Sequence, residues 1–165
     1  MNKVMAASLG ALVVAFTLSG CITIQLPAGT GDGQASGSTI TCEQTQTITE
    51  SGTYRLTGRC PNLAIEANDV VVTAGDVVNL DITGDRVNVT STETTTLVIG
   101  GNSNIVEAGA LSDAQIAGDR NSVHTVGALD RAVINGNDNK IAADGGVISV
   151  FDNGERTEIG GADLG

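Results

Sequence analysis

Four charged residues in the second half of the chain are the candidates for catalysis: Asp119, Arg120, Asp138 and Lys140. A pair of carboxylates is what glycoside-cleaving enzymes use for acid–base chemistry. Such enzymes also need aromatic platforms for sugar rings, whereas this chain has no Trp, 1 Tyr and 2 Phe. We therefore expect these four residues to be solvated at turns and the protein not to be an enzyme. A carbohydrate-active enzyme on a β-helix scaffold is the alternative.

The only histidine, His124, is the other candidate for a general base. It follows Val123, so in an extended strand the two side chains point to opposite faces. A catalytic histidine needs a nucleophile and an orienting acid, and the sequence around His124 contains no recognisable pair of this kind. We expect Val123 to face the core and His124 to lie on the surface.

The chain begins with the features of a bacterial lipoprotein signal peptide. Lys3 precedes an apolar run over residues 4–16, which is too short for a stable transmembrane span. The box Leu18-Ser19-Gly20-Cys21 resembles the bacterial lipobox, and this implies cleavage after residue 20 and diacylglycerol on the Cys21 thiol. We expect a signal peptide over residues 1–20 and a lipid anchor on the extracytoplasmic face of the cell membrane. An ordinary signal peptide with an incidental cysteine is the alternative.

The two remaining cysteines, Cys42 and Cys60, are eighteen residues apart. This is also the length of the repeat in the second half of the chain. In an exported protein such a pair favours a disulfide over a metal site, and no histidine or further cysteine lies near enough to complete a set of zinc ligands. We expect a disulfide that stabilises the fold by roughly 3 kcal/mol. A reactive redox pair is the alternative, although there is no Cys-x-x-Cys spacing.

Composition places the rest of the chain in one acidic domain. Removal of residues 1–20 deletes Lys3 and no acidic residue, so the net charge changes from −11 to −12, and we exclude nucleic acid as a partner. We expect residues 21–39 to be the lipidated cysteine and a flexible Gly-rich tether, with a reach of roughly 23 Å. Residues 40–165 then form a β-repeat domain. The alternative is that residues 22–26 form a first strand.

Glycine recurs every nine residues in the second half of the chain, at Gly100, Gly109, Gly118, Gly127, Gly136, Gly145 and Gly154. Alternate units resemble each other more than neighbours do, so one structural turn is two units, or eighteen residues, long. We expect these glycines at corners where the backbone needs positive φ.

An apolar column accompanies the glycines at a constant offset: Ile105, Val123, Ile141 and Ile159, with Ala114, Ala132 and Val150 in the alternate units. Stacked coils would bring these side chains together in the core of the solenoid. The spacings between Val72, Val89 and Ile105 are seventeen and sixteen, so the early coils are slightly shorter. The pattern predicts an all-β, two-sided β-solenoid of about seven coils with an eighteen-residue period. An antiparallel β-sandwich is the alternative.

Nine-residue glycine units also occur in the calcium-binding β-roll, whose repeat carries an aspartate at a fixed place. Here that place holds Ile105, Val123 and Ile141, so an ion column cannot form. We expect no metal and no other cofactor, and scattered weak calcium sites are the alternative.

Two features carry a family resemblance: the run from Cys60 to Val72, and the Gly-Asn-x-Asn turns at residues 101–104 and 136–139. They resemble the bacterial family known as domain of unknown function three thousand and sixty, over roughly residues 40–159. The resemblance implies an exported, often lipidated protein with Gly-Asn-rich β repeats, and it supplies no catalytic residues. We expect a membrane-anchored envelope lipoprotein with a non-catalytic structural or binding role and an envelope protein or cell-wall partner.

Overall fold

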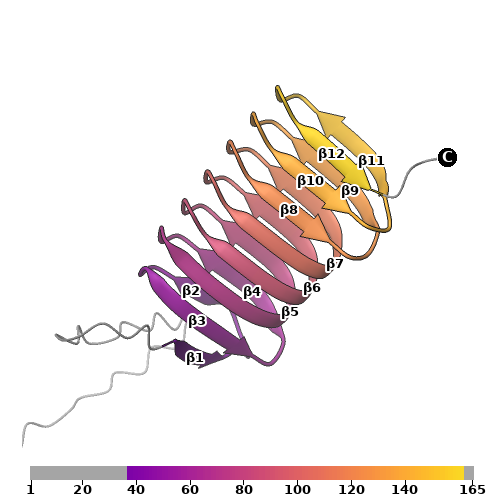
Figure 1. Ribbon diagram of the computed structural model, residues 1–165. Helices are drawn as coiled ribbons and strands as arrows, with labels where there is room; N and C mark the ends of the chain where they lie inside the picture. The colour runs from indigo at the N-terminus through magenta and orange to yellow at the C-terminus, as the bar shows by residue number, and fades with distance from the viewer. Residues whose placement is uncertain (1–36, 162–165) are drawn as a thin grey trace, which may run out of the picture.

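The computed structural model describes residues 37–161, and all regular secondary structure in this range is β-strand. Every pair of neighbouring strands is parallel. The chain winds through about seven stacked coils (Figure 1). The predicted β-solenoid is therefore confirmed, and the alternative of an antiparallel sandwich is wrong.

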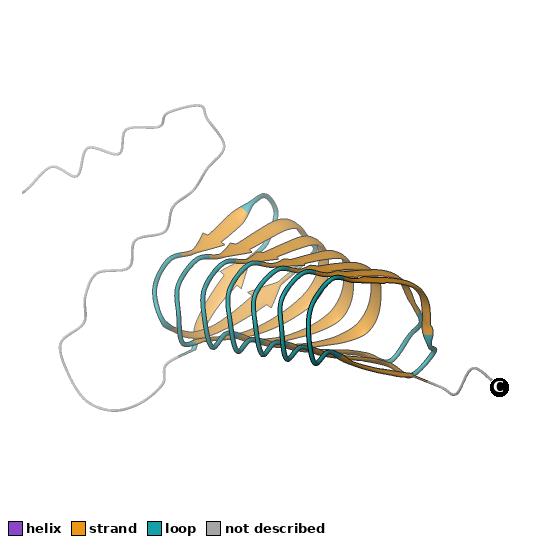
Figure 2. Cartoon of the chain, turned by 90° about the horizontal axis from the view of Figure 1, so that it is seen from above, coloured by secondary structure: helices purple, strands orange, loops and turns teal. Residues whose placement is uncertain are grey.

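The strands form two ladders that share their three central members. The shared strands are β5 (Val70–Ile82), β6 (Asn88–Ile99) and β7 (Ile105–Ile116). One side of the coil adds β1 (Ser38–Thr41), β3 (Gly52–Thr57), β8 (Ser122–Thr125), β10 (Lys140–Ala143) and β12 (Glu158–Gly161). The other side adds β2 (Gln46–Ile48), β4 (Cys60–Ile65), β9 (Leu129–Ile134) and β11 (Val147–Asp152). The loops of successive coils lie in register along the stack (Figure 2).

The length of a coil changes along the solenoid. The offset between successive coils is seventeen from β5 to β7, as in Val72↔Val89, and eighteen from β9 onward, as in Ala114↔Ala132. Since Ala108↔Thr125 still has the shorter offset, the added residue falls between β8 and β9. The predicted period of eighteen thus holds for the later coils but not for the central ones.

The core consists of stacked columns of branched side chains. One column contains six isoleucines, each at most 3% exposed, at Ile48, Ile65, Ile82, Ile99, Ile116 and Ile134. Burial of one such side chain stabilises the fold by about 1.5–3 kcal/mol. The column ends at Asp152, which is paired with Ile134 in the last described coil, so the apolar stack stops at a charge.

The predicted core column is right in its middle and wrong at both ends. Val123, Ile141, Ala114 and Ala132 are all buried. Ile105 is 45% exposed, and its neighbour Val106 lies in the core, because the shorter offset of the central coils moves the inward position by one.

Val150 and Ile159 are in register with the core column but are 37% and 43% exposed. They belong to the last described coil, so no further described coil covers them.

No helix in residues 37–161 is long and apolar enough to cross a membrane. The predicted signal peptide, Cys21 and residues 22–36 of the predicted tether lie outside the described residues.

Candidate functional site

The charged residues singled out in the sequence lie on a row of equivalent four-residue turns along one edge of the solenoid. These turns are residues 67–70, 84–87, 101–104, 118–121, 136–139 and 154–157. Each turn places its four residues in four columns that run along the stack. We call them the glycine, acceptor, left-handed and inner columns, in chain order.

Glycine is required in the glycine column because successive coils lie in close contact there. A Cβ on Gly101, Gly118 or Gly136 would lie 1.9–2.0 Å from the carbonyl oxygen of the equivalent residue in the preceding coil, which is closer than any side chain tolerates. None of these glycines has positive φ. The prediction that they supply positive φ is therefore wrong: they are needed because one backbone passes directly over another. Gly100 is not a member, since Gly101 holds this place.

The left-handed column carries the positive φ instead. Its members have φ between 55° and 57° and are Asp69, Arg86, Ser103, Arg120, Asp138 and Arg156. A left-handed backbone costs a residue with a side chain of the order of 1–3 kcal/mol. The N–H of each of the first five donates to a carbonyl of the next coil at 2.8–3.0 Å, so every coil is held in this conformation by its neighbour.

The acceptor column is a ladder of side-chain oxygens that bind backbone N–H groups. The N–H groups of Asp85, Asn102, Asp119, Asn137 and Glu155 each donate to the side chain one coil earlier, at 2.7, 2.7, 2.9, 2.7 and 3.0 Å respectively. Asparagine and aspartate alternate here, because both offer the Oδ1 acceptor that the ladder needs.

The inner column contains three buried asparagines, Asn104, Asn121 and Asn139, each at most 1% exposed. Their Oδ1 atoms accept the N–H groups of Val87, Asn104 and Asn121 at 2.7, 2.9 and 2.8 Å. The Nδ2 groups of Asn121 and Asn139 donate to carbonyls of the glycine column at 3.1 and 2.9 Å. Buried amides that are bonded in this way fix the register of the stack, because a buried donor without a partner is costly.

Opposite charges meet along the left-handed column. Arg86 binds Asp69 through two nitrogens, at 2.7 and 2.8 Å, and Arg156 binds Asp138 in the same manner, with Nη2 2.7 Å from Oδ2. The guanidinium of Arg156 lowers the pKa of the Asp138 carboxyl, chiefly through hydrogen bonding, and the charge of Arg120 adds to this. All these groups are exposed, so each pair stabilises the fold only modestly.

Three of the four catalytic candidates contact a neighbouring coil in this geometry. Asp119 holds the N–H of Asn137, Asp138 holds Arg156, and Lys140 lies 3.6 Å from Glu158. Asp119 and Asp138 occupy different columns of consecutive coils, each with its own partner. These contacts attach one coil to the next.

His124 lies on the outer face of β8, with 43% of its side chain exposed, whereas Val123 is 1% exposed. The predicted orientation of both residues is confirmed. An acid that sequence inspection missed does contact the ring, since Nε2 is 3.1 Å from Oδ1 of Asp144. The two residues are 20 apart in sequence, so only the stacking of coils brings them together.

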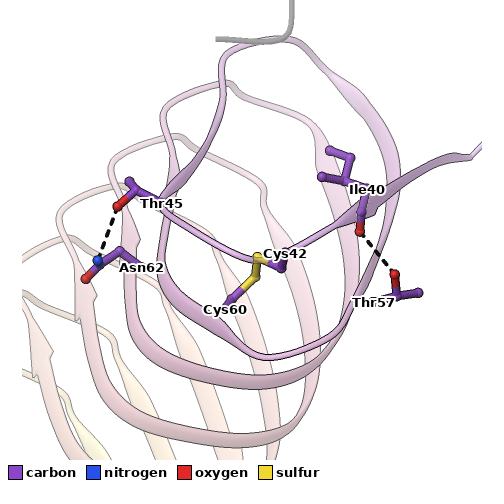
Figure 3. Close-up of a disulfide and its surroundings, with 6 residues drawn as sticks. All are labelled: Ile40, Cys42, Thr45, Thr57, Cys60 and Asn62. Atoms are coloured by element: carbon purple, nitrogen blue, oxygen red, sulfur yellow. Dashed lines mark hydrogen bonds between the residues drawn. A yellow bond between two sulfur atoms is a disulfide. The ribbon is translucent and has the colours of Figure 1, made fainter. Parts of the chain in front are cut away.

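Cys42 and Cys60 form the predicted disulfide, with their Cα atoms 5.0 Å apart (Figure 3). Both residues are at most 2% exposed. Cys42 follows β1 and Cys60 begins β4, so the bond joins the first coil to the second. The polar pair Thr45 and Asn62, 3.2 Å apart, connects the same two coils beside it.

A hollow at the N-terminal end, lined by β1, β2 and Tyr54, has a volume of about 210 Å³, below the usual range of ligand pockets. Burial there raises the pKa of the Tyr54 hydroxyl, and the charge of Glu50 adds to this. Within residues 37–161 no three metal-ligating side chains come together.

Comparisons with known proteins add no relative: no protein-family model, no curated protein and no solved structure matches the chain.

Proposed function

We propose that this protein is a lipid-anchored lipoprotein of the cell envelope with a non-catalytic structural or binding role. The location rests on the lipobox that ends at Cys21 and on the apolar run before it. The resemblance to the domain of unknown function three thousand and sixty supports the same proposal, because that family is exported and often lipidated.

The observation that carries the non-catalytic role is the use of polar groups at the turns. Asp119 and Asp138, the two carboxylates best placed for catalysis by sequence, each hold a neighbouring coil. The pairing with Arg156 lowers the pKa of the Asp138 carboxyl and so opposes its use as the protonated general acid that glycosidic cleavage requires. The buried asparagine bonds between coils make the solenoid a regular support, which suits a role in presenting surfaces to a partner.

The dimensions are consistent with a support outside the membrane. About seven coils at ~4.8 Å each give a stack of roughly 34 Å, and the predicted tether adds a reach of roughly 23 Å. A lipid on Cys21 would therefore hold the described domain near, but clear of, the lipid headgroups.

The anchor is tested by detergent phase partitioning of the full chain and its Cys21→Ser variant. The unmodified chain is expected in the detergent phase, and the variant as an uncleaved or a water-soluble form. A Cys42→Ser, Cys60→Ser double variant is the control, because it keeps the lipidation site and should still enter the detergent phase. Equal partitioning of all three proteins into the detergent phase would remove the lipid anchor from the proposal.

A further inference from the structure

The isoleucine column of the core ends at a charged residue. The last described coil places Asp152 in this column, in register with Ile134. The other described members are the six buried isoleucines. A carboxylate therefore stands where a further coil would need an apolar side chain.

The rest of the last described coil keeps the features that stack one coil on the next. Val150 is 37% exposed, although its partner Ala132 is buried. Ile159 is 43% exposed, although its partner Ile141 is buried. Within residues 37–161, β11 pairs with β9 alone and β12 with β10 alone, so one edge of each strand is open. Open strand edges beside apolar side chains are a template for pairing with a second copy of a chain.

The turn that follows β11 holds the Asp152 carboxylate in place. Its Oδ1 accepts the N–H of Gly154 at 2.8 Å and the hydroxyl of Thr157 at 3.4 Å. In earlier turns the N–H groups of Gly84 and Gly101 donate instead to carbonyls of the isoleucine column, at 3.2 and 3.3 Å. Asp152 takes part in none of the ion pairs among the described residues, so its charge is not neutralised by a cation.

We propose that Asp152 is an end cap, which prevents a second copy of this chain from stacking on the last described coil. A copy in that position would cover Val150, Ile159 and the open edges of β11 and β12, but it would also remove the Asp152 carboxylate from water. A buried carboxylate without a cation is costly. If two identical ends met, two such carboxylates would lie close together and repel each other.

Charged side chains at open strands are a general means by which β proteins avoid association through their edges. The end cap goes beyond the proposed function, because it concerns contacts between copies and holds with or without a lipid anchor. It leaves the long faces of each solenoid free for other contacts.

The test is sedimentation equilibrium of the full chain in a density-matched nonionic detergent, over a range of protein concentrations. Asp152→Ile extends the isoleucine column and removes the charge, so we expect its dissociation constant for self-association to be smaller than that of the unmodified chain by about tenfold or more. Asp152→Asn keeps an Oδ1 acceptor for Gly154 and Thr157, so its turn is expected to fold. Its dissociation constant should fall between those of Asp152→Ile and the unmodified chain.

Two controls locate the contact. Asp81→Ile makes the same change at an exposed position of β5, in the middle of the stack, and should associate no more tightly than the unmodified chain. Addition of Val150→Asp to Asp152→Ile restores a charge to the end and should abolish the gain. The end cap would be overturned if neither Asp152 variant associates more tightly than the unmodified chain, if Asp81→Ile shows an equal gain, or if the gain survives Val150→Asp.

Discussion

Replacement of Asn121 by alanine tests whether the buried amides hold the solenoid together. The Asn121 side chain is 1% exposed, accepts the N–H of Asn104 at 2.9 Å and donates to the carbonyl of Gly101 at 3.1 Å. Asn121→Ala leaves one buried donor and one buried acceptor without these partners. At about 1–3 kcal/mol for each group, the free energy of unfolding should fall by roughly 2–6 kcal/mol.

Asn79→Ala is the matched control for this experiment. Asn79 likewise takes part in two hydrogen bonds to the preceding coil, both donated by Nδ2, to Asn62 at 2.9 Å and to the carbonyl of Pro61 at 3.4 Å, but these bonds are exposed. Water replaces the lost partner there, so we expect a loss below about 1 kcal/mol. Urea unfolding of the full chain, monitored by circular dichroism, measures both values. Equal losses for Asn121→Ala and Asn79→Ala would show that the buried amides do not hold the coils together.

Three further predictions concern the same coils. Val123→Asp should lower the free energy of unfolding by several kcal/mol, because it buries an unpaired charge, whereas His124→Asp should change it by less than about 0.5 kcal/mol. Equally small effects of the two variants in urea unfolding would show that Val123 is wrongly assigned to the core column. Gly118→Ala should lower the thermal midpoint clearly, because its Cβ would lie 1.9 Å from a carbonyl oxygen, and an unchanged midpoint would contradict the close contact between coils. The pKa of the Asp138 carboxyl should lie below its ordinary value of 3.8, so its pairing with Arg156 is present above that pH and is lost as the pH falls through the lowered pKa. NMR titration should find this pKa raised in Arg156→Gln. An unchanged pKa would contradict the pairing.

The sequence was sufficient to predict the solenoid because its signals are repeated in every coil. Small residues and branched apolar residues recur at fixed offsets, and the separation of Cys42 and Cys60, eighteen residues, is close to the offsets of sixteen and seventeen between the first two coils. Each repetition strengthens the same interpretation. The buried positions of Val123 and Ile141 followed from this alone.

The errors arose where the repeat changes length. A fixed period of nine placed Gly100 and Ile105 in columns that Gly101 and Val106 occupy, because the coils from β5 to β8 are one residue shorter than those after the added residue near Gly127. A one-residue shift moves a strand side chain to the opposite face. A scan that allowed the period to change would have found the correct register.

The role of the turns was harder to predict, because it depends on contacts between coils. The alternation of Asn102 and Asp119 looks like a decay of the Gly-Asn-x-Asn motif, yet both residues provide the same Oδ1 acceptor. In the same way, Gly118 is needed for a neighbouring carbonyl and not for its own φ. Neither fact is visible in a single turn without the coil stacked on it.

We propose that this solenoid binds a partner in the envelope and does not turn over a substrate. In-cell crosslinking of the tagged full chain, followed by its recovery, tests this most directly. We expect the same envelope protein or cell-wall fragment to be recovered in repeated experiments. Recovery of the protein alone, together with polysaccharide turnover that Asp119→Ala or Asp138→Ala abolishes, would contradict it.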